Sequence, residues 1–71
     1  MGAPPQSLRQ KLLDTLRQLD TAATSEQLAA IHEQPLSVVA YHLQVLEHEG
    51  HIALASTEPI GGKLVRSWVY R

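Results

Sequence analysis

The chain has 71 residues, a hydrophobic content of 44% and a formal net charge of -1 at pH 7. This length allows one small domain, near the size at which a single core is only marginally sufficient. Because there is no cysteine, disulfides, thiolate metal sites and cysteine nucleophiles are all excluded. No apolar run approaches membrane-spanning length and no signal-peptide pattern is present, so we expect a cytoplasmic protein with no membrane partner. The near-neutral charge counts against nucleic-acid binding, since domains that bind nucleic acids are usually basic.

The chain begins with a segment that contains two consecutive prolines, residues 1–6, which we expect to be a flexible lead-in. Residues 7–71 are expected to form the domain. Leucines recur at helical spacing along 7–19, and they follow Ser7, which fits a helix N-cap with Gln10 completing a capping box. The pattern predicts a first helix with one leucine-rich face.

Two further start signals predict a helix-turn-helix. Thr24 and Gln27 fit a second capping box, which indicates a short helix over 25–32. Pro35 fits the first turn of a third helix over 35–49, because its missing N–H would have no partner there. A short helix, a tight turn and a longer helix together make a helix-turn-helix.

After Gly50, a natural helix end, the period of the apolar residues changes from 3.6 to about 2. The segments 51–57 and 63–71 are predicted as two strands, and the proline and glycines of 58–62 indicate the turn between them. We therefore expect a mostly α fold with a small β-hairpin, an α+β domain of the three-helix winged helix-turn-helix type. The predicted core is Leu12, Leu16, Leu28, Ile31, Val39, Leu43, Leu46, Ile52 and Leu54, with Trp68 or Tyr70 closing one side.

The stretch SEQLAAI…PLSVVAYHLQVLEHEGHIAL resembles the winged helix-turn-helix of bacterial ArsR-like transcription regulators. The resemblance is carried by Val39, Tyr41, His42, Leu43, Leu46, Gly50 and Ile52. The segment STEPIGG and the strand after it are similar to the wing of the same regulators. The resemblance implies transcription regulation through double-stranded DNA. Three features depart from it: HEQ stands where the turn commonly has glycine, the wing tip reads GGK where an arginine–glycine pair is common, and no helix follows the wing.

In a helix-turn-helix the second helix enters the major groove, and its outward N-terminal residues contact base edges. This assigns the recognition role to 35–49 and a backbone or minor-groove role to the wing, 57–66. Gln44 can pair with adenine, and the wing cations can contact phosphates. The expected DNA-binding residues are Ser37, Val38, Ala40, Tyr41, Gln44, Lys63 and Arg66.

The third helix contains no lysine or arginine, so a monomer should bind DNA weakly. A dimer would combine two weak half-sites. The first helix contains more leucine than a small core needs, and it is the surface left for self-association in the absence of a helix after the wing. We expect a homodimer through Leu8, Leu12, Leu13, Leu16 and Leu19.

A protein-binding module is the alternative. A near-neutral surface with exposed aliphatics, among them Val38 and Val45, suits a partner protein, so the domain could be an adaptor or an inhibitor of a larger regulator.

Metal binding and catalysis have little support in the sequence. The histidines are His32, His42, His48 and His51, and their spacing supplies no tetrahedral ligand set, so we expect no metal and no cofactor. His42 lies beside the apolar stripe and is expected to be packed and hydrogen-bonded. No serine–histidine–acid arrangement, phosphate loop or paired carboxylate stands out, so we expect no enzymatic activity.

Overall fold

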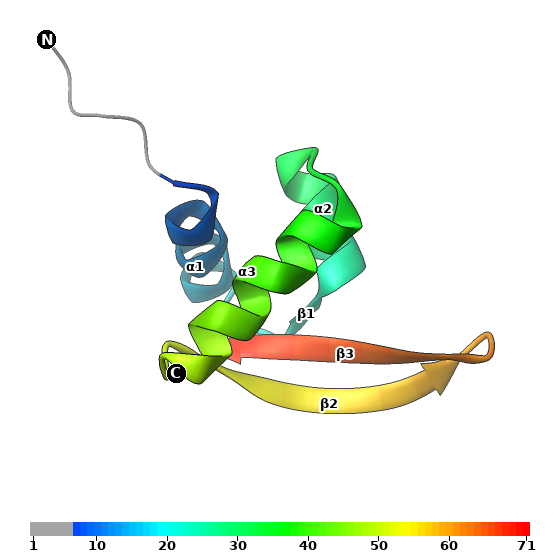
Figure 1. Cartoon of the computed structure of the whole chain (residues 1–71). Helices are drawn as coiled ribbons and strands as arrows, with labels where there is room; N and C mark the ends of the chain where they lie inside the picture. Colours follow the sequence, from blue (N-terminus) through cyan, green and yellow to red (C-terminus); the bar gives the residue numbers. More distant parts are fainter. Residues whose placement is uncertain (1–6) are drawn as a thin grey trace, which may run out of the picture.

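The computed structural model describes residues 7–71, so the expected lead-in at 1–6 lies outside the described residues. The elements follow in the order α1 (Leu8–Leu19), β1 (Ala23–Thr24), α2 (Ser25–His32), α3 (Leu36–His48), β2 (Ile52–Ile60) and β3 (Lys63–Tyr70). The helices lie on one side of the sheet, and the β2–β3 hairpin extends beyond them (Figure 1). The predicted α+β fold class is confirmed, and the layout is compatible with a winged helix. No helix within 7–71 combines the length and apolarity needed to cross a bilayer.

The first two helices begin at the predicted N-caps, but the box predicted at Ser7 is only half formed, because the Gln10 side chain donates to Asp14 Oδ1 at 3.1 Å and not back to Ser7. The backbone N–H of Gln10 donates to Ser7 Oγ at 3.2 Å. At α2 the box is reciprocal, because Gln27 N donates to Thr24 Oγ1 at 3.1 Å and Thr24 N donates to Gln27 Oε1 at 2.9 Å. Each cap satisfies N–H groups that have no partner inside the helix.

α3 ends as predicted and begins differently. Gly50 has a φ of +85°, the left-handed conformation that glycine adopts without strain, and its N–H donates to Glu47 O at 3.0 Å. Pro35 lies just before the helix as its N-cap and makes no side-chain cap. Its carbonyl accepts from the N–H groups of Val38 and Val39, each at 3.1 Å.

The three strands form one antiparallel sheet in the order β1-β3-β2. β1 was not predicted, since two residues are too few to show a period; it pairs Ala23 with Trp68. The hairpin turn is shorter than the predicted 58–62, because β2 continues to Ile60 and only Gly61 and Gly62 lie outside the strands. A proline is tolerated at position 59 because β2 is an edge strand.

The core lies where the helices meet the sheet. Its buried members are Leu12, Leu16, Ala23, Leu28, Val39, Leu43, Leu46, Ile52 and Trp68, which confirms most of the prediction and adds Ala23.

Two predicted members of the core are wrong: Ile31 is 54% exposed and Leu54 is 42% exposed. Ile31 follows the buried Leu28 by three positions, and this turns it to the edge of α2's buried face. Leu54 lies on the edge strand, just before a register shift in the ladder, where it is only partly covered. Of the two aromatic residues expected to close the core, Trp68 is buried and Tyr70 is 41% exposed.

Candidate nucleic-acid interface

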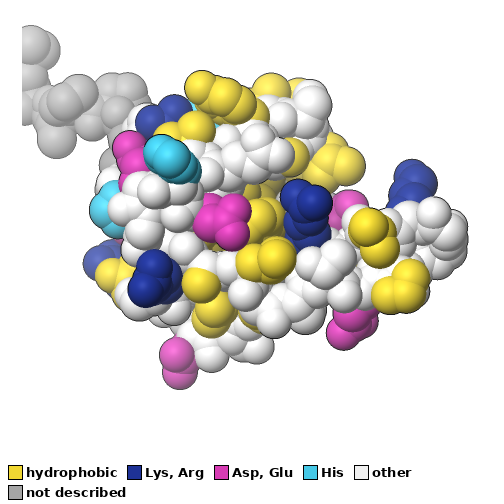
Figure 2. Space-filling model, turned by 60° about the horizontal axis from the view of Figure 1, so that its bottom comes forward, with side chains coloured by type: hydrophobic (Ala, Val, Ile, Leu, Met, Phe, Trp, Pro, Cys, Tyr) yellow, Lys and Arg dark blue, Asp and Glu magenta, His cyan; other side chains and the backbone are white. Residues whose placement is uncertain are grey.

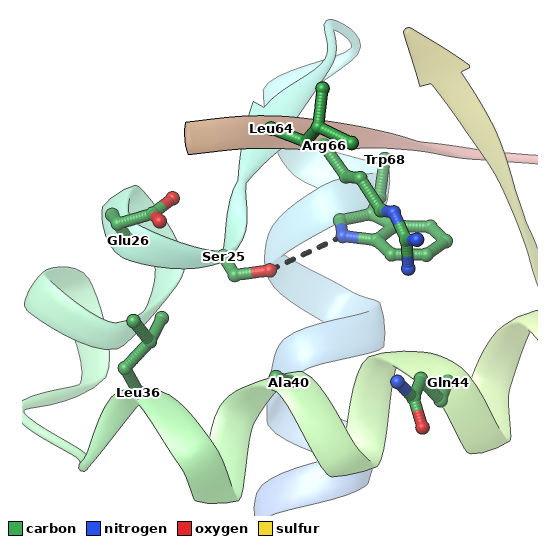
Figure 3. A pocket seen from close by; sticks show the side chains of 8 residues that line it. All are labelled: Ser25, Glu26, Leu36, Ala40, Gln44, Leu64, Arg66 and Trp68. Atoms are coloured by element: carbon green, nitrogen blue, oxygen red, sulfur yellow. Dashed lines mark hydrogen bonds between the residues drawn. The ribbon is translucent and has the colours of Figure 1, made fainter. Parts of the chain in front are cut away.

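An open groove of about 230 Å³ lies between α3, β3 and the start of α2. Its lining residues are Ser25, Glu26, Leu36, Ala40, Gln44, Leu64, Arg66 and Trp68. The α3 members recur every four residues and therefore share one flank of the helix. The β3 members recur every two residues and therefore share one face of the strand. Figure 3 shows Arg66 and Trp68 extending from β3 toward α3, across from Gln44.

Trp68 forms the floor of the groove. Trp68 is 3% exposed, and its Nε1–H donates to Ser25 Oγ at 3.4 Å, a contact drawn in Figure 3. This bond ties the C-terminal half of β3 to the first residue of α2. The strand that carries Arg66 is therefore held against the helix-turn-helix.

Three of the expected DNA-binding residues meet at this groove: Ala40, Gln44 and Arg66. Gln44 and Arg66 are exposed, whereas Ala40 is half-buried. A side-chain amide that can read a base and a cation that can bind phosphate thus lie on one surface, although they come from different elements.

The other expected residues lie outside the groove. Ser37, Val38 and Tyr41 are exposed elsewhere on α3, and the Tyr41 ring is edge-on to His42 with centroids 5.5 Å apart. Lys63 is the first residue of β3, at the end of the hairpin, opposite Ile60.

The charge of the interface is mixed. Arg66 shares the groove with Glu26, and the exposed Glu47 lies further along α3. In the face shown in Figure 2, the Lys and Arg side chains are separated by acidic and hydrophobic ones and form no continuous strip. Long-range attraction of a polyanion to this face is therefore weak.

Two of the three cations of α1 are engaged within the chain. Arg9 Nε donates to Nδ1 of His42 on α3 at 3.4 Å, and Arg17 Nη2 lies 3.2 Å from Asp14 Oδ1. Lys11 is exposed. None of these three residues lines the groove, and Arg66 is the cation that shares it with Gln44.

The histidines are dispersed. His42 is half-buried and accepts from Arg9, in agreement with the expected packed, hydrogen-bonded role. His32 Nε2 lies 2.8 Å from Thr15 Oγ1, and His51 Nε2 lies 3.9 Å from Glu49 Oε1. Within residues 7–71, no three His, Cys, Asp or Glu side chains are grouped so that they could hold a metal ion.

The leucines expected at a dimer contact divide into two groups. Leu12 and Leu16 are 0% exposed, so the expectation is wrong for both: they face the chain's own core and leave no surface for a second copy. Leu8 and Leu13 are partly buried and pack against that core. Only Leu19 is exposed, at 41%. It borders a second, uncharged pocket of about 380 Å³ together with Ile31.

Sequence reasoning missed two aliphatic members of the groove, Leu36 and Leu64, which are 45% and 71% exposed. A signal was present in both cases. Leu36 precedes Ala40 and Gln44 at intervals of four, and Leu64 precedes Arg66 by two.

Neither a family model nor a curated protein matches the chain.

Proposed function

We propose that the chain binds double-stranded DNA as a small, ArsR-like bacterial transcription regulator of the cytoplasm. The observation that carries this proposal is the shared groove of Gln44 on α3 and Arg66 on the wing. A helix that enters the major groove brings the DNA backbone against the element beside it. Here that element is the β2–β3 hairpin, which extends past α3 (Figure 1).

Base reading and backbone attraction fall on different residues in this arrangement. The Gln44 amide can donate to and accept from an adenine, while Val38 and Ala40 suit thymine methyl groups. Ser37 and the Tyr41 hydroxyl can bond phosphate oxygens. Lys63 and Arg66 supply charge without reading sequence.

The test measures binding as a function of salt on duplexes selected from a random-sequence pool. Gln44→Ala should weaken binding to the selected site by about 1–3 kcal/mol and leave non-specific binding almost unchanged. Lys63→Ala and Arg66→Ala should weaken binding to every sequence, and each should lower the salt slope by about one unit. Lys11→Ala is the matched control, because it removes an exposed cation of α1 and should leave the slope unchanged.

A specific observation favours a protein-binding module as the second candidate. α3 exposes the apolar side chains of Val38 and Tyr41 on the side away from the groove, and Leu36 is exposed in the groove, where Glu26 adds negative charge beside Arg66. Exposed aliphatic and aromatic groups of this kind suit a partner protein. If the wild-type chain binds no duplex even at low salt, the DNA proposal fails and this second function takes its place.

A further inference from the structure

A polar contact joins the first helix to α3. Arg9 on α1 and His42 on α3 are both half-buried, and Arg9 Nε donates to His42 Nδ1 at 3.4 Å. His42 lies at the margin of the buried stripe of α3, because it comes directly before the fully buried Leu43. The guanidinium is planar and its N–H groups have fixed directions, so the bond sets the orientation of the imidazole relative to α1.

The bond also determines where the His42 ring carries its proton. A guanidinium N–H donates and never accepts, so Nδ1 of His42 is the ring nitrogen without a proton, and in the neutral ring the proton is on Nε2. A second histidine joins α1 to α2. Thr15 Oγ1 donates to Lys11 O at 2.9 Å, so it accepts from Nε2 of His32 at 2.8 Å. His32 therefore provides a comparison, because its bond to α1 does not involve α3.

The His42 ring in turn contacts the ring of Tyr41. The two ring centroids are 5.5 Å apart and the planes meet at 63°, which is an edge-on arrangement. Consecutive residues of a helix do not normally face each other, so this contact depends on the orientation of the His42 ring. Tyr41 is 59% exposed, so little other packing holds its side chain. The direction of the Tyr41 hydroxyl is therefore set from α1, through His42.

We propose that Arg9 is a positioning residue for DNA binding: through His42 it holds the Tyr41 ring so that the hydroxyl meets a phosphate. This inference rests on the proposed function, in which the Tyr41 hydroxyl bonds a phosphate oxygen. Arg9 does not line the groove that contains Gln44, and in this role its charge does not contact DNA. Holding the ring in advance raises affinity, because the side-chain freedom is lost before binding and not during it.

The first measurement needs no DNA. The nitrogen chemical shifts of the His42 ring, recorded by NMR on the full chain at about pH 8 where an ordinary histidine is neutral, report which nitrogen carries the proton. The wild type should carry it on Nε2. Arg9→Leu keeps an aliphatic stem and has no donor, so both tautomers should appear and the ring resonances of Tyr41 should shift. Arg17→Leu is the matched control on the same helix; its partner is Asp14 on α1, and it should change neither signal.

The second measurement is affinity across a salt series, on a duplex selected by the wild-type chain from a random-sequence pool. Tyr41→Phe removes a hydrogen bond to a charged group and should weaken binding about tenfold. Arg9→Leu should weaken it about three- to tenfold, because the Tyr41 side chain must then be ordered on binding. The salt slope should not change, since no cation leaves a phosphate. In the Tyr41→Phe chain, Arg9→Leu should have almost no further effect, because the hydroxyl that it positions is absent.

Two histidine variants separate the bond from the ring. His42→Asn keeps an acceptor close to the place of Nδ1 but has no ring to pack against Tyr41, so it should weaken binding as Arg9→Leu does. His32→Asn is its control, because it changes the histidine that joins α1 to α2, and it should leave the affinity unchanged.

The proposal is overturned if wild-type His42 carries its proton on Nδ1, if Arg9→Leu lowers the salt slope by about one unit, or if the effects of Arg9→Leu and Tyr41→Phe add. A lower slope would mean that Arg9 contacts a phosphate directly, and additive effects would mean that it acts without Tyr41. All three results leave DNA binding by the wild type intact. A wild-type chain that binds no duplex at low salt overturns the proposed function and this role with it, whereas the proton position tests the contact alone. Melting curves check that the variants fold; if Arg9→Leu does not, Arg9→Met, which also has no donor, is held to the same outcomes.

Discussion

Leu43 has no exposed surface, and its neighbours in the core come from every helix and from the sheet. Shortening this side chain to alanine leaves a cavity in a domain that has only one core. We expect Leu43→Ala to lower the free energy of unfolding by about 2–5 kcal/mol, a large share of the stability of so small a protein. Urea denaturation followed by circular dichroism measures the change. Leu36→Ala is the control, because Leu36 is 45% exposed on the same helix and its loss should cost much less. An unchanged denaturation midpoint for Leu43→Ala would contradict the expectation.

For single residues, helical phase could be predicted from the sequence, but the neighbour that each face meets could not. Phase places Leu12 and Leu16 on one stripe of α1, and both are buried. Their assignment to a dimer contact failed because the same stripe also serves the core, and a small domain has few apolar residues to spare. The prediction that Ile31 is buried failed because its apolar character is not matched by its position. It lies at the edge of α2's buried face, where it is 54% exposed and lines the second pocket.

For whole elements, the helices could be predicted because capping is local. In an N-cap, a side chain accepts a hydrogen bond from the backbone N–H three residues later, so both partners lie within four residues of sequence. The start of a capped helix can therefore be predicted from that short segment. Sheet pairing is not local. The two residues of β1 form a strand only because they pair with β3, and that pairing cannot be seen in the local sequence. The length of the hairpin turn depends on whether Pro59 pairs as part of β2, which is possible because β2 is an edge strand.

The turn between α2 and α3 carries a strain that can be removed. Glu33 has a φ of +52°, a left-handed conformation that a side chain makes costly. Its N–H donates to Ala30 O and the N–H of Gln34 donates to Ala29 O, so the turn is fixed by backbone bonds that do not need the glutamate. We expect Glu33→Gly to raise the free energy of unfolding by about 0.5–1 kcal/mol. Thermal melting measures this rise, and Gln34→Gly, at a neighbour without positive φ, should bring no gain. A lower melting temperature for Glu33→Gly would show that the glutamate side chain supports the turn.

At the scale of the described domain, 7–71, exposed aliphatic side chains line two separate hollows. One is the groove beside α3, with Leu36 and Leu64. The other is the second pocket, where Leu19 and Ile31 stand on the rim and three alanines (Ala22, Ala23 and Ala30) lie among the lining residues. On α2, Gln27 and Ile31 line this pocket, whereas Ser25 and Glu26 line the groove beside α3. A contact at the second pocket therefore leaves the α3 groove open.

If the chain self-associates as the sequence predicts, we expect the contact at this second pocket and not on the buried stripe of α1. Its lining contains no charged residue, so two identical copies can meet there without like charges facing each other. Leu19 and Ile31 can enter the partner's alanine-lined hollow, and two such contacts related by a two-fold axis are equivalent. The patch is smaller than the roughly 800 Å² per partner of a standard interface, so we expect a weak dimer.

Sedimentation equilibrium without DNA should show a Kd on the order of 10–100 μM. Ile31→Glu should weaken association at least about tenfold, since it places a charge in an apolar contact, and should leave the melting temperature nearly unchanged because Ile31 is half exposed. Leu64→Glu, the control at the wing, should leave association unchanged. A monomer at several hundred micromolar would exclude self-association and leave DNA binding to a single copy. A loss of association in Leu64→Glu alone would place the contact at the wing and exclude this pocket.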